Sequence, residues 1–110
     1  MIEKVKGNKQ LIVSIVEKGL GSTVVEASKK AGCEGGTILP GTGTYKDHSS
    51  FMSYFADPEK EIIFSIVDET EAEDILLAIC EAASLNEPGN GVAFILNVNS
   101  LLGVAHLLDC

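Results

Sequence analysis

Apolar residues gather in four short segments that have the composition of β-strands. Residues 10–16 (Gln-Leu-Ile-Val-Ser-Ile-Val) and residues 61–67 (Glu-Ile-Ile-Phe-Ser-Ile-Val) are nearly continuous runs rich in β-branched side chains. Such runs are typical of strands that are covered on at least one face. A shorter segment at 37–39, which we expect to end at Pro40, and a last one at 92–98 complete the set. The pattern therefore predicts four strands.

Two of the intervening segments have the spacing of amphipathic helices. The first is predicted to begin at Ser22, whose hydroxyl can cap a helix, and to end at Gly32. The second is predicted to begin at Thr70, which forms a capping box with Glu73. Apolar side chains recur every three or four residues in both segments. They are Leu20, Val24, Ala27 and Ala31 in the first helix and Ile75, Leu76, Ile79, Ala82 and Ala83 in the second.

The order of these elements is βαββαβ within a chain of 110 residues. The fold typical of that order is a four-stranded antiparallel sheet with two helices on one face. We therefore predict a single α+β domain, residues 1–110, with the ferredoxin-like arrangement. The first and third strands are the most apolar, which suits the two central positions of that topology.

Both central strands carry apolar side chains on both faces. In the first strand, Leu11, Val13 and Ile15 point to one side, and Ile12 and Val16 point to the other. The third strand places Ile62, Phe64 and Ile66 opposite Ile63, Ser65 and Val67. Because the helices can cover only one face of the sheet, we predict an oligomer that buries the other face.

A long polar loop joins the second and third strands. We place it at about residues 41–57. Loops longer than about 12–15 residues are uncommon in compact domains and usually have a function. This loop contains large apolar or aromatic side chains, namely Tyr45, Phe51, Met52, Tyr54 and Phe55. Such a loop either folds back on the protein or enters the groove of a partner, and we favour the partner.

The net charge of −8 and the absence of arginine exclude a nucleic-acid interface. Residues 1–56 carry seven lysines and five acids, and residues 57–110 carry one lysine and eleven acids, so no basic footprint forms. No apolar run approaches the roughly 18 residues of a membrane span. Residues 1–9 also lack the apolar core of a signal peptide. We therefore expect a cytoplasmic protein that does not insert into membranes.

The sequence contains no recognisable catalytic or metal-binding motif. Ser14, Ser65 and Ser84 lack the context of a catalytic triad. His48 and His106 are far apart in the sequence, and the cysteines form no CxxC pair. We therefore predict no enzyme activity and no metal site.

With its turns and strands in this order, the chain resembles the P-II nitrogen-regulatory proteins and their divergent P-II-like relatives. The resemblance extends from Gln10 to Val104, which is nearly the whole chain. No single motif is unique to that family, but the order and spacing of the motifs together are specific. The matching stretches are Gln10–Gly19, Ala31–Leu39, Gly41–Thr44, Pro58–Ile62 and Glu87–Phe94.

The resemblance implies a homotrimer with three functional segments in each subunit. The T-loop, at about 41–57, would engage a target protein, such as a membrane transporter or an enzyme of nitrogen metabolism. The B-loop, at about 86–91, would bind an adenine nucleotide together with the C-terminal segment of the neighbouring subunit. The implied nucleotide-binding positions are Thr37, Gly41, Thr42, Gly43, Thr44, Gly89, Asn90 and Gly91, and the implied partner-binding positions are Tyr45, Lys46, His48, Phe51 and Tyr54.

The basic residues with which P-II proteins hold phosphates are absent. Val92 stands where the usual B-loop ends in lysine, and Gly103 and Ala105 align with two arginines of the C-terminal segment. Each charge-assisted hydrogen bond that is lost removes about 1.5–3 kcal/mol. AMP, ADP, another adenosine compound or no nucleotide at all is therefore favoured over ATP.

The sequence leaves three hypotheses. The first is a P-II-like regulator that senses a small ligand at clefts between its subunits and signals through the T-loop. The second is a trimeric structural interaction module without nucleotide binding, in which the glycines only shape tight turns. The third is a metal-handling trimer of the ferredoxin-like kind.

Overall fold

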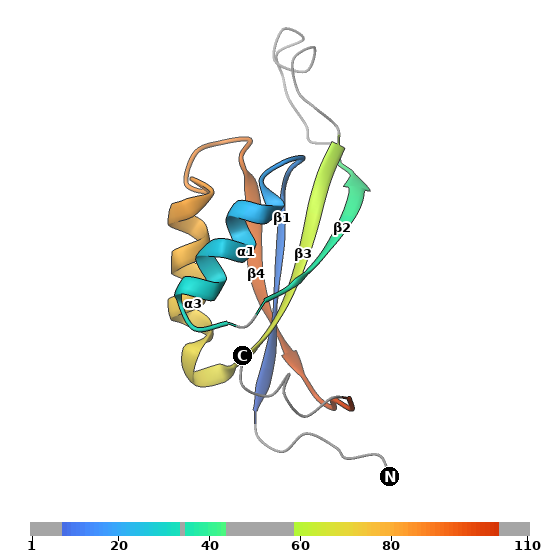
Figure 1. The fold of residues 1–110 in the computed structure, drawn as a ribbon, viewed down its shortest axis with the longest axis vertical. Coiled ribbons are helices and arrows are strands. Elements are labelled where there is room, and N and C mark those ends of the chain that lie inside the picture. The colour runs from blue at the N-terminus through green and yellow to red at the C-terminus, as the bar shows by residue number, and fades with distance from the viewer. Residues whose placement is uncertain (1–7, 34, 44–58, 104–110) are drawn as a thin grey trace, which may run out of the picture.

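The computed structural model describes residues 8–33, 35–43 and 59–103 of the chain. In this part of the chain the elements follow in the order βαββαβ (Figure 1), which confirms the predicted α+β, ferredoxin-like class. The strands are β1 (Lys9–Glu17), β2 (Thr37–Thr42), β3 (Glu59–Asp68) and β4 (Gly91–Val98), and the helices are α1 (Gly21–Lys30) and α3 (Glu69–Ala82).

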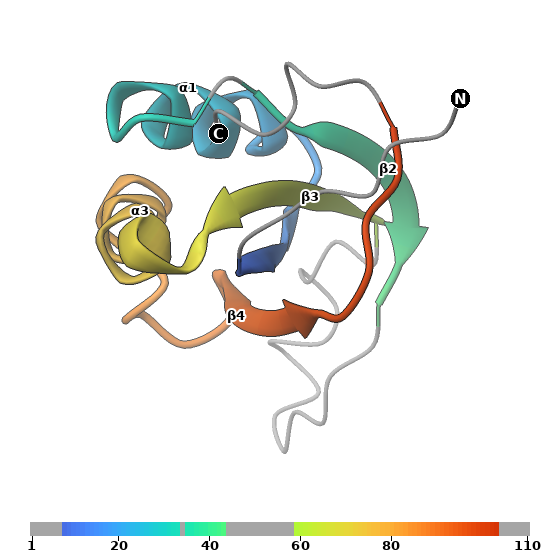
Figure 2. The same ribbon diagram turned by 90° about the horizontal axis from the view of Figure 1, so that it is seen from below.

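The four strands form one antiparallel sheet in the order β2-β3-β1-β4. The first and third strands are therefore the central ones, as their apolar composition predicted. Both helices lie on the same face of the sheet (Figures 1 and 2). Neither of the helices in the described residues is long and apolar enough to cross a membrane.

The hydrophobic core lies between the two helices and the sheet. Its fully buried apolar side chains are Ile12 and Val16 of β1, Val24 of α1, Ile63 and Val67 of β3, and Ile75 and Ile79 of α3. Burying one side chain of this size stabilises a fold by about 1.5–3 kcal/mol. This layer therefore holds the helices to the sheet.

The buried stripe of α3 differs slightly from the predicted one. Ala82, which we expected to be buried, is exposed, and Ala72 is buried instead. The buried positions Ala72, Ile75, Ile79 and Ala83 follow one another at three- and four-residue spacing. Ala82 lies one position away from this line, so the helix turns it outward.

The second face of the sheet is also apolar, as predicted, and we call it the open face. No helix of the described residues lies on it (Figure 2). Antiparallel pairing aligns its side chains in rows, such as Phe64, Val13 and Phe94. Phe94 keeps 39% of its surface exposed. The apolar residues of the open face are Leu11, Val13 and Ile15 of β1, Leu39 of β2, Ile62, Phe64 and Ile66 of β3, and Val92, Phe94 and Leu96 of β4.

Our expectation that β2 ends at Pro40 is wrong. The strand continues to Thr42, with Pro40 opposite Glu61 and Gly41 opposite Lys60. Proline lacks the N–H that a central strand must donate, but β2 is an edge strand with a neighbour on one side only. The edge position therefore tolerates the proline.

The predicted cap of the first helix is also wrong. The helix begins at Gly21, and no side chain of its own N-cap residue, Leu20, caps it. Instead, one carboxylate oxygen of Glu61, Oε1, accepts hydrogen bonds from the backbone N–H groups of Gly19 (2.9 Å) and Gly21 (2.8 Å). A negative group at a helix N-terminus is favourable for the helix dipole. A residue of β3 thus replaces Ser22 as the cap.

The capping box predicted at Thr70 is likewise absent, because α3 starts directly at the end of β3. Its N-cap residue is Asp68, whose side chain makes no capping hydrogen bond. The Asp68 carboxylate instead forms an ion pair with the ammonium group of Lys9, its partner across the sheet. The strand pairing therefore sets where the helix begins.

We predict that Glu61→Ala lowers stability by about 0.5–2 kcal/mol, the range for the loss of a helix cap. The two glycine N–H groups at the start of α1 would lose the acceptor that they share. The measurement is the midpoint of urea denaturation at a fixed protein concentration.

Glu59→Ala is the matched control for this substitution. It removes an exposed ion pair with Lys18, and exposed pairs contribute about 0–1 kcal/mol. Equal shifts of the midpoint for the two variants would show that Glu61 does not act as the cap.

Candidate functional site

Four segments of the chain meet at one end of the sheet, the upper end in Figure 1. They are the end of β1 with the turn into α1, the end of β2, the start of β3, and the turn that leads into β4. The strand register fixes this meeting, since Glu17 lies opposite Lys60, Val16 opposite Gly91, and Thr42 opposite Glu59. Segments that are distant in the sequence therefore share one end of the molecule.

A hollow of about 400 Å³ lies at this end of the sheet, and we call it the glycine groove. It brings together three of the predicted ligand positions, one from the base of the T-loop and two from the B-loop. The residues that line it are Ile15, Val16, Glu17, Gly43, Lys60, Gly89, Gly91 and Val92.

The B-loop side of the glycine groove requires glycine at Gly91. This residue has a φ of +135°, and a Cβ atom there would lie 2.3 Å from the backbone oxygen of Ile15. Gly89 also has a positive φ, of +86°, but a Cβ atom there would meet nothing within 4 Å. At Gly91, therefore, both the backbone conformation and the close approach of β1 exclude a side chain.

The predicted position Asn90 has a different role in the described structure. Its side-chain Nδ2 donates a hydrogen bond to the backbone oxygen of Ser84 at 2.9 Å. Its backbone N–H also donates to the oxygen of Glu87 at 3.3 Å. These contacts close the turn between Gly89 and Gly91, and Asn90 is not among the residues that line the groove.

Two charged residues of the glycine groove were missed by reasoning from the sequence. Glu17 and Lys60 lie directly opposite each other in the pairing of β1 with β3. A Cβ atom on Gly43 would lie 3.0 Å from Cγ of Lys60, so the aliphatic part of this lysine runs along the base of the T-loop. The register of β1 against β3, which only the structure gives, identifies this pair.

The remaining wall of the glycine groove is apolar. Val92 is 52% exposed and lines the groove, at the position where the resemblance leads one to expect a lysine. Ile15 lies opposite Val92 in the pairing of β1 with β4. Both residues belong to the open face as well, so the groove is continuous with that apolar surface.

A second hollow, of about 360 Å³, adjoins the first, and we call it the loop-base groove. Gly41 and Thr42 line this groove, and Lys60 lines both grooves. At its edge the ammonium group of Lys18 lies 3.0 Å from a carboxylate oxygen of Glu59. The backbone N–H of Lys18 also donates to the oxygen of Glu59 at 3.2 Å. The turn after β1 is thus fastened to the start of β3.

Of the other predicted site residues, the structure describes only Thr37, which does not line these grooves of its own subunit. Thr37 starts β2 opposite Phe64, four residues before Gly41 and hence about 13 Å away along the strand. The T-loop positions Thr44, Tyr45, Lys46, His48, Phe51 and Tyr54 lie outside the described residues. The role of these positions stays a prediction.

Among the described residues, no group of three or more histidine, cysteine, aspartate or glutamate side chains could hold a metal ion. His48 and His106 lie outside the described ranges. Ser14 and Ser65 are buried at 1% exposure in the sheet.

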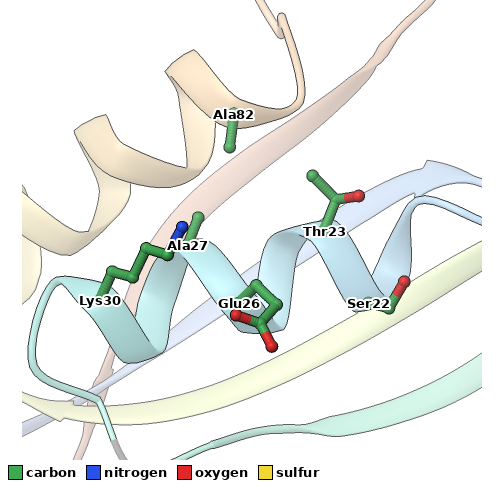
Figure 3. Close-up of a pocket in the computed structure, with 6 residues that line it drawn as sticks. All are labelled: Ser22, Thr23, Glu26, Ala27, Lys30 and Ala82. Atoms are coloured by element: carbon green, nitrogen blue, oxygen red, sulfur yellow. The ribbon is translucent and has the colours of Figure 1, made fainter.

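A third hollow, of about 370 Å³, lies on the outer surface between α1 and α3, and we call it the helix groove. Figure 3 shows that α1 supplies almost all of its lining and that Ala82 of α3 stands across from it. The hydroxyl group of Ser22, the expected helix cap, belongs to this lining. The lining mixes hydroxyl, carboxylate and ammonium groups with alanines, and none of its residues was among the predicted site positions.

Comparison with known proteins places the chain beside P-II signalling proteins. A family model described as nitrogen regulatory protein P-II matches residues 9–104. A PII-like signalling protein from Thermus thermophilus is similar, with a TM-score of 0.62 and 25% identity over 84% of this chain and 87% of that chain. Arabidopsis thaliana PII bound to citrate shares the fold, with a TM-score of 0.64 and 22% identity over 84% of this chain and 77% of that chain. The comparison with curated proteins found no match.

We predict that Gly91→Ala destabilises the protein by at least about 2 kcal/mol more than Gly89→Ala does. Both substitutions impose a positive φ on alanine, but only the first drives a Cβ atom against the backbone of β1. The readout is the midpoint of urea denaturation for each variant. Equal midpoints would mean that the turn moves away from β1 at little cost.

Proposed function

This chain belongs to the nitrogen regulatory protein P-II family, and we propose that it is a signalling protein that senses a small ligand in the glycine groove and regulates a target through the T-loop. One observation carries this proposal most directly. The base of the T-loop, at Gly43, and the B-loop, at Gly89 and Gly91, line the same groove. A ligand held there would contact both loops.

We further propose that the protein is a homotrimer in which other subunits cover the open face. Apolar side chains run across all four strands of that face, and those of Phe64, Phe94 and Leu96 are among the exposed ones. Contiguous apolar surfaces of this kind mark interaction sites. Because Phe64, Phe94 and Leu96 are 37%, 39% and 49% exposed, burial of what remains of each would contribute about half or less of the roughly 1.5–3 kcal/mol of complete burial. This is the same face that the sequence predicted to be buried in an oligomer.

Assembly of this kind would convert the glycine groove into a cleft between subunits. Ile15 and Val92 belong both to the open face and to the lining of the groove. A second subunit packed on the open face would therefore border the groove. This supports an intersubunit ligand site of the type that the resemblance implies.

The proposed ligand is a small anionic compound, with adenine nucleotides as the first candidates. AMP and ADP are favoured over ATP, because Lys60 is the one basic side chain among the described residues that line the groove. The Arabidopsis thaliana relative is described with bound citrate. Citrate therefore belongs among the compounds to be tested.

The proposed signal is a shift in the population of T-loop conformations. Ligand contacts at Gly43 and Lys60 would favour one arrangement of the loop base, and the target would bind one arrangement better than the other. The contacts of Lys18 with Glu59 hold the start of β3 against the turn after β1, next to the loop base. The target is proposed to be a membrane transporter or an enzyme of nitrogen metabolism, and the protein itself acts as a regulator.

A second candidate function is a structural trimer without a ligand. The observation in its favour is Val92, which gives the groove an apolar wall where a phosphate-binding lysine would stand. The ligand experiment below separates the two functions.

We predict that Phe94→Glu converts the trimer into monomers, because it places a charge in the apolar row that Phe94 forms with Val13 and Phe64 on the open face. The mass of the particle in solution, from light scattering after gel filtration, measures this change.

Leu77→Glu is the control for the assembly experiment. Leu77 is 59% exposed on α3, which lies on the other side of the sheet, so this variant should keep the wild-type mass. A Phe94→Glu variant that remains trimeric would show that the open face is not the interface.

We predict that AMP or ADP raises the melting temperature of the wild-type trimer and slows hydrogen exchange in residues 41–57. Gly43→Val should weaken both responses, because the new side chain would press against Lys60 in the groove. Thermal shift and hydrogen exchange with AMP, ADP, ATP and citrate measure the effect.

Gly35→Val is the matched control for the ligand experiment. A Cβ atom on Gly35 would meet its nearest neighbour at an ordinary 3.9 Å, and Gly35 does not line the groove. An intact trimer that responds to none of these compounds would favour the structural module over the sensor.

A further inference from the structure

The glycine groove contains an acidic residue at the place where a nucleotide phosphate would need a cation. We propose that Glu17 determines the ligand class of this groove, so that a nucleoside or a nucleoside monophosphate binds more tightly than di- and triphosphates. This inference rests on the proposed function, since it concerns the same ligand site.

The register of the sheet places Glu17 beside the basic residue of the groove. Glu17 and Lys60 are direct cross-strand partners in the antiparallel pairing of β1 with β3. Side chains of direct partners lie on the same face, with Cβ atoms about 4.5–5.5 Å apart. An anionic group bound at Lys60 therefore lies close to the Glu17 carboxylate as well.

Glu17 and Lys60 also lie on the same face of the sheet as the apolar residues of the open face. Side chains alternate along a strand, so Glu17 shares its face with Ile15, and Lys60 shares its face with Ile62. Glu17 is half-buried, and it lines the groove together with Ile15 and Val92. These apolar neighbours reduce the access of water and so strengthen the effect of its charge on a bound anion.

The charge balance of the groove limits the number of phosphates that it can hold. Among the described lining residues, Lys60 contributes one positive charge and Glu17 one negative charge. A first phosphate group can lie next to Lys60, but a second or third adds negative charge near Glu17 without a further cation of the described lining. Like charges at close range disfavour binding.

The overall charge of the chain does not offset this balance. It contains no arginine, and its net charge is −8. Among the described lysines, Lys9 is paired with Asp68 and Lys18 with Glu59. Assembly of several copies multiplies the net negative charge, so the surrounding potential also opposes polyanions.

A ligand series in which only the number of phosphates changes isolates the effect of phosphate charge from that of the adenosine group. Adenosine, AMP, ADP and ATP are titrated against the full-length wild-type protein by calorimetry, without divalent cations that would neutralise the phosphates. The affinity is expected to fall at least about threefold for each phosphate beyond the first.

Two substitutions at Glu17 test whether this residue causes the expected order of affinities for AMP, ADP and ATP. Glu17→Gln removes the negative charge with little change in shape, and Glu17→Lys reverses it. The ratio of ATP affinity to AMP affinity is expected to rise in Glu17→Gln and to rise by at least about tenfold in Glu17→Lys.

Glu26→Lys is the matched control. It produces the same change in net charge as Glu17→Lys, but Glu26 lines the helix groove and not the glycine groove. Its effect should be small and similar for AMP and ATP. Light scattering after gel filtration verifies that each variant keeps the wild-type assembly.

Two outcomes would overturn only the role of Glu17, and a third would also overturn nucleotide sensing. Wild-type protein that binds ATP more tightly than AMP overturns the role of Glu17 but leaves the ligand sensor intact. Glu17→Lys that changes the ratio no more than Glu26→Lys also overturns it. Binding of no member of the series, by either the wild type or the Glu17 variants, overturns this role together with nucleotide sensing in the proposed function.

Discussion

The antiparallel pairing of β1 with β3 is the constraint on which the rest of the protein depends. It runs through nine residue pairs, from Lys9 with Asp68 to Glu17 with Lys60. Side chains alternate between the faces of a strand, so a slip of one residue would move Ile12 and Val16 from the core to the open face. The same register brings the Glu61 carboxylate to the first turn of α1. Core, helix start and groove therefore follow from one set of hydrogen bonds.

The same register would link the proposed assembly to the proposed ligand site. The open face ends at the glycine groove, where the row of Ile62, Ile15 and Val92 is followed by the charged pair Lys60 and Glu17. A subunit that covers the apolar rows would also close the groove. The B-loop comes close to β1 because Gly91 has no side chain. A groove built on rigid strands and one tight turn can hold a ligand while the neighbouring loop changes conformation.

Much of the fold could be predicted from local pattern, and the errors have a common cause. The four strands, the two helices and the central position of the first and third strands follow from apolar periodicity and composition. The strand end at Pro40 and the helix caps at Ser22 and Thr70 were wrong because each was inferred from neighbours in sequence. Pro40 is tolerated at an edge of the sheet, and the donors near Ser22 are satisfied by Glu61, forty residues from Gly21. Local rules cannot include such partners.

The sequence by itself determined the βαββαβ order and the apolar character of both faces of the central strands. It also indicated that the glycines at positions 43, 89 and 91 lie in turns. These features depend only on the composition and spacing of neighbouring residues. Only the tertiary structure determined that these three glycines line one groove and that Glu17 lies opposite Lys60 within it. The reason is that strand pairing joins residues more than forty positions apart, and their charges would act together on a ligand only through that proximity. The resemblance to P-II proteins leads one to expect a phosphate-binding lysine at the position of Val92. The acidic residue beside the remaining lysine could be found only from the register of the sheet.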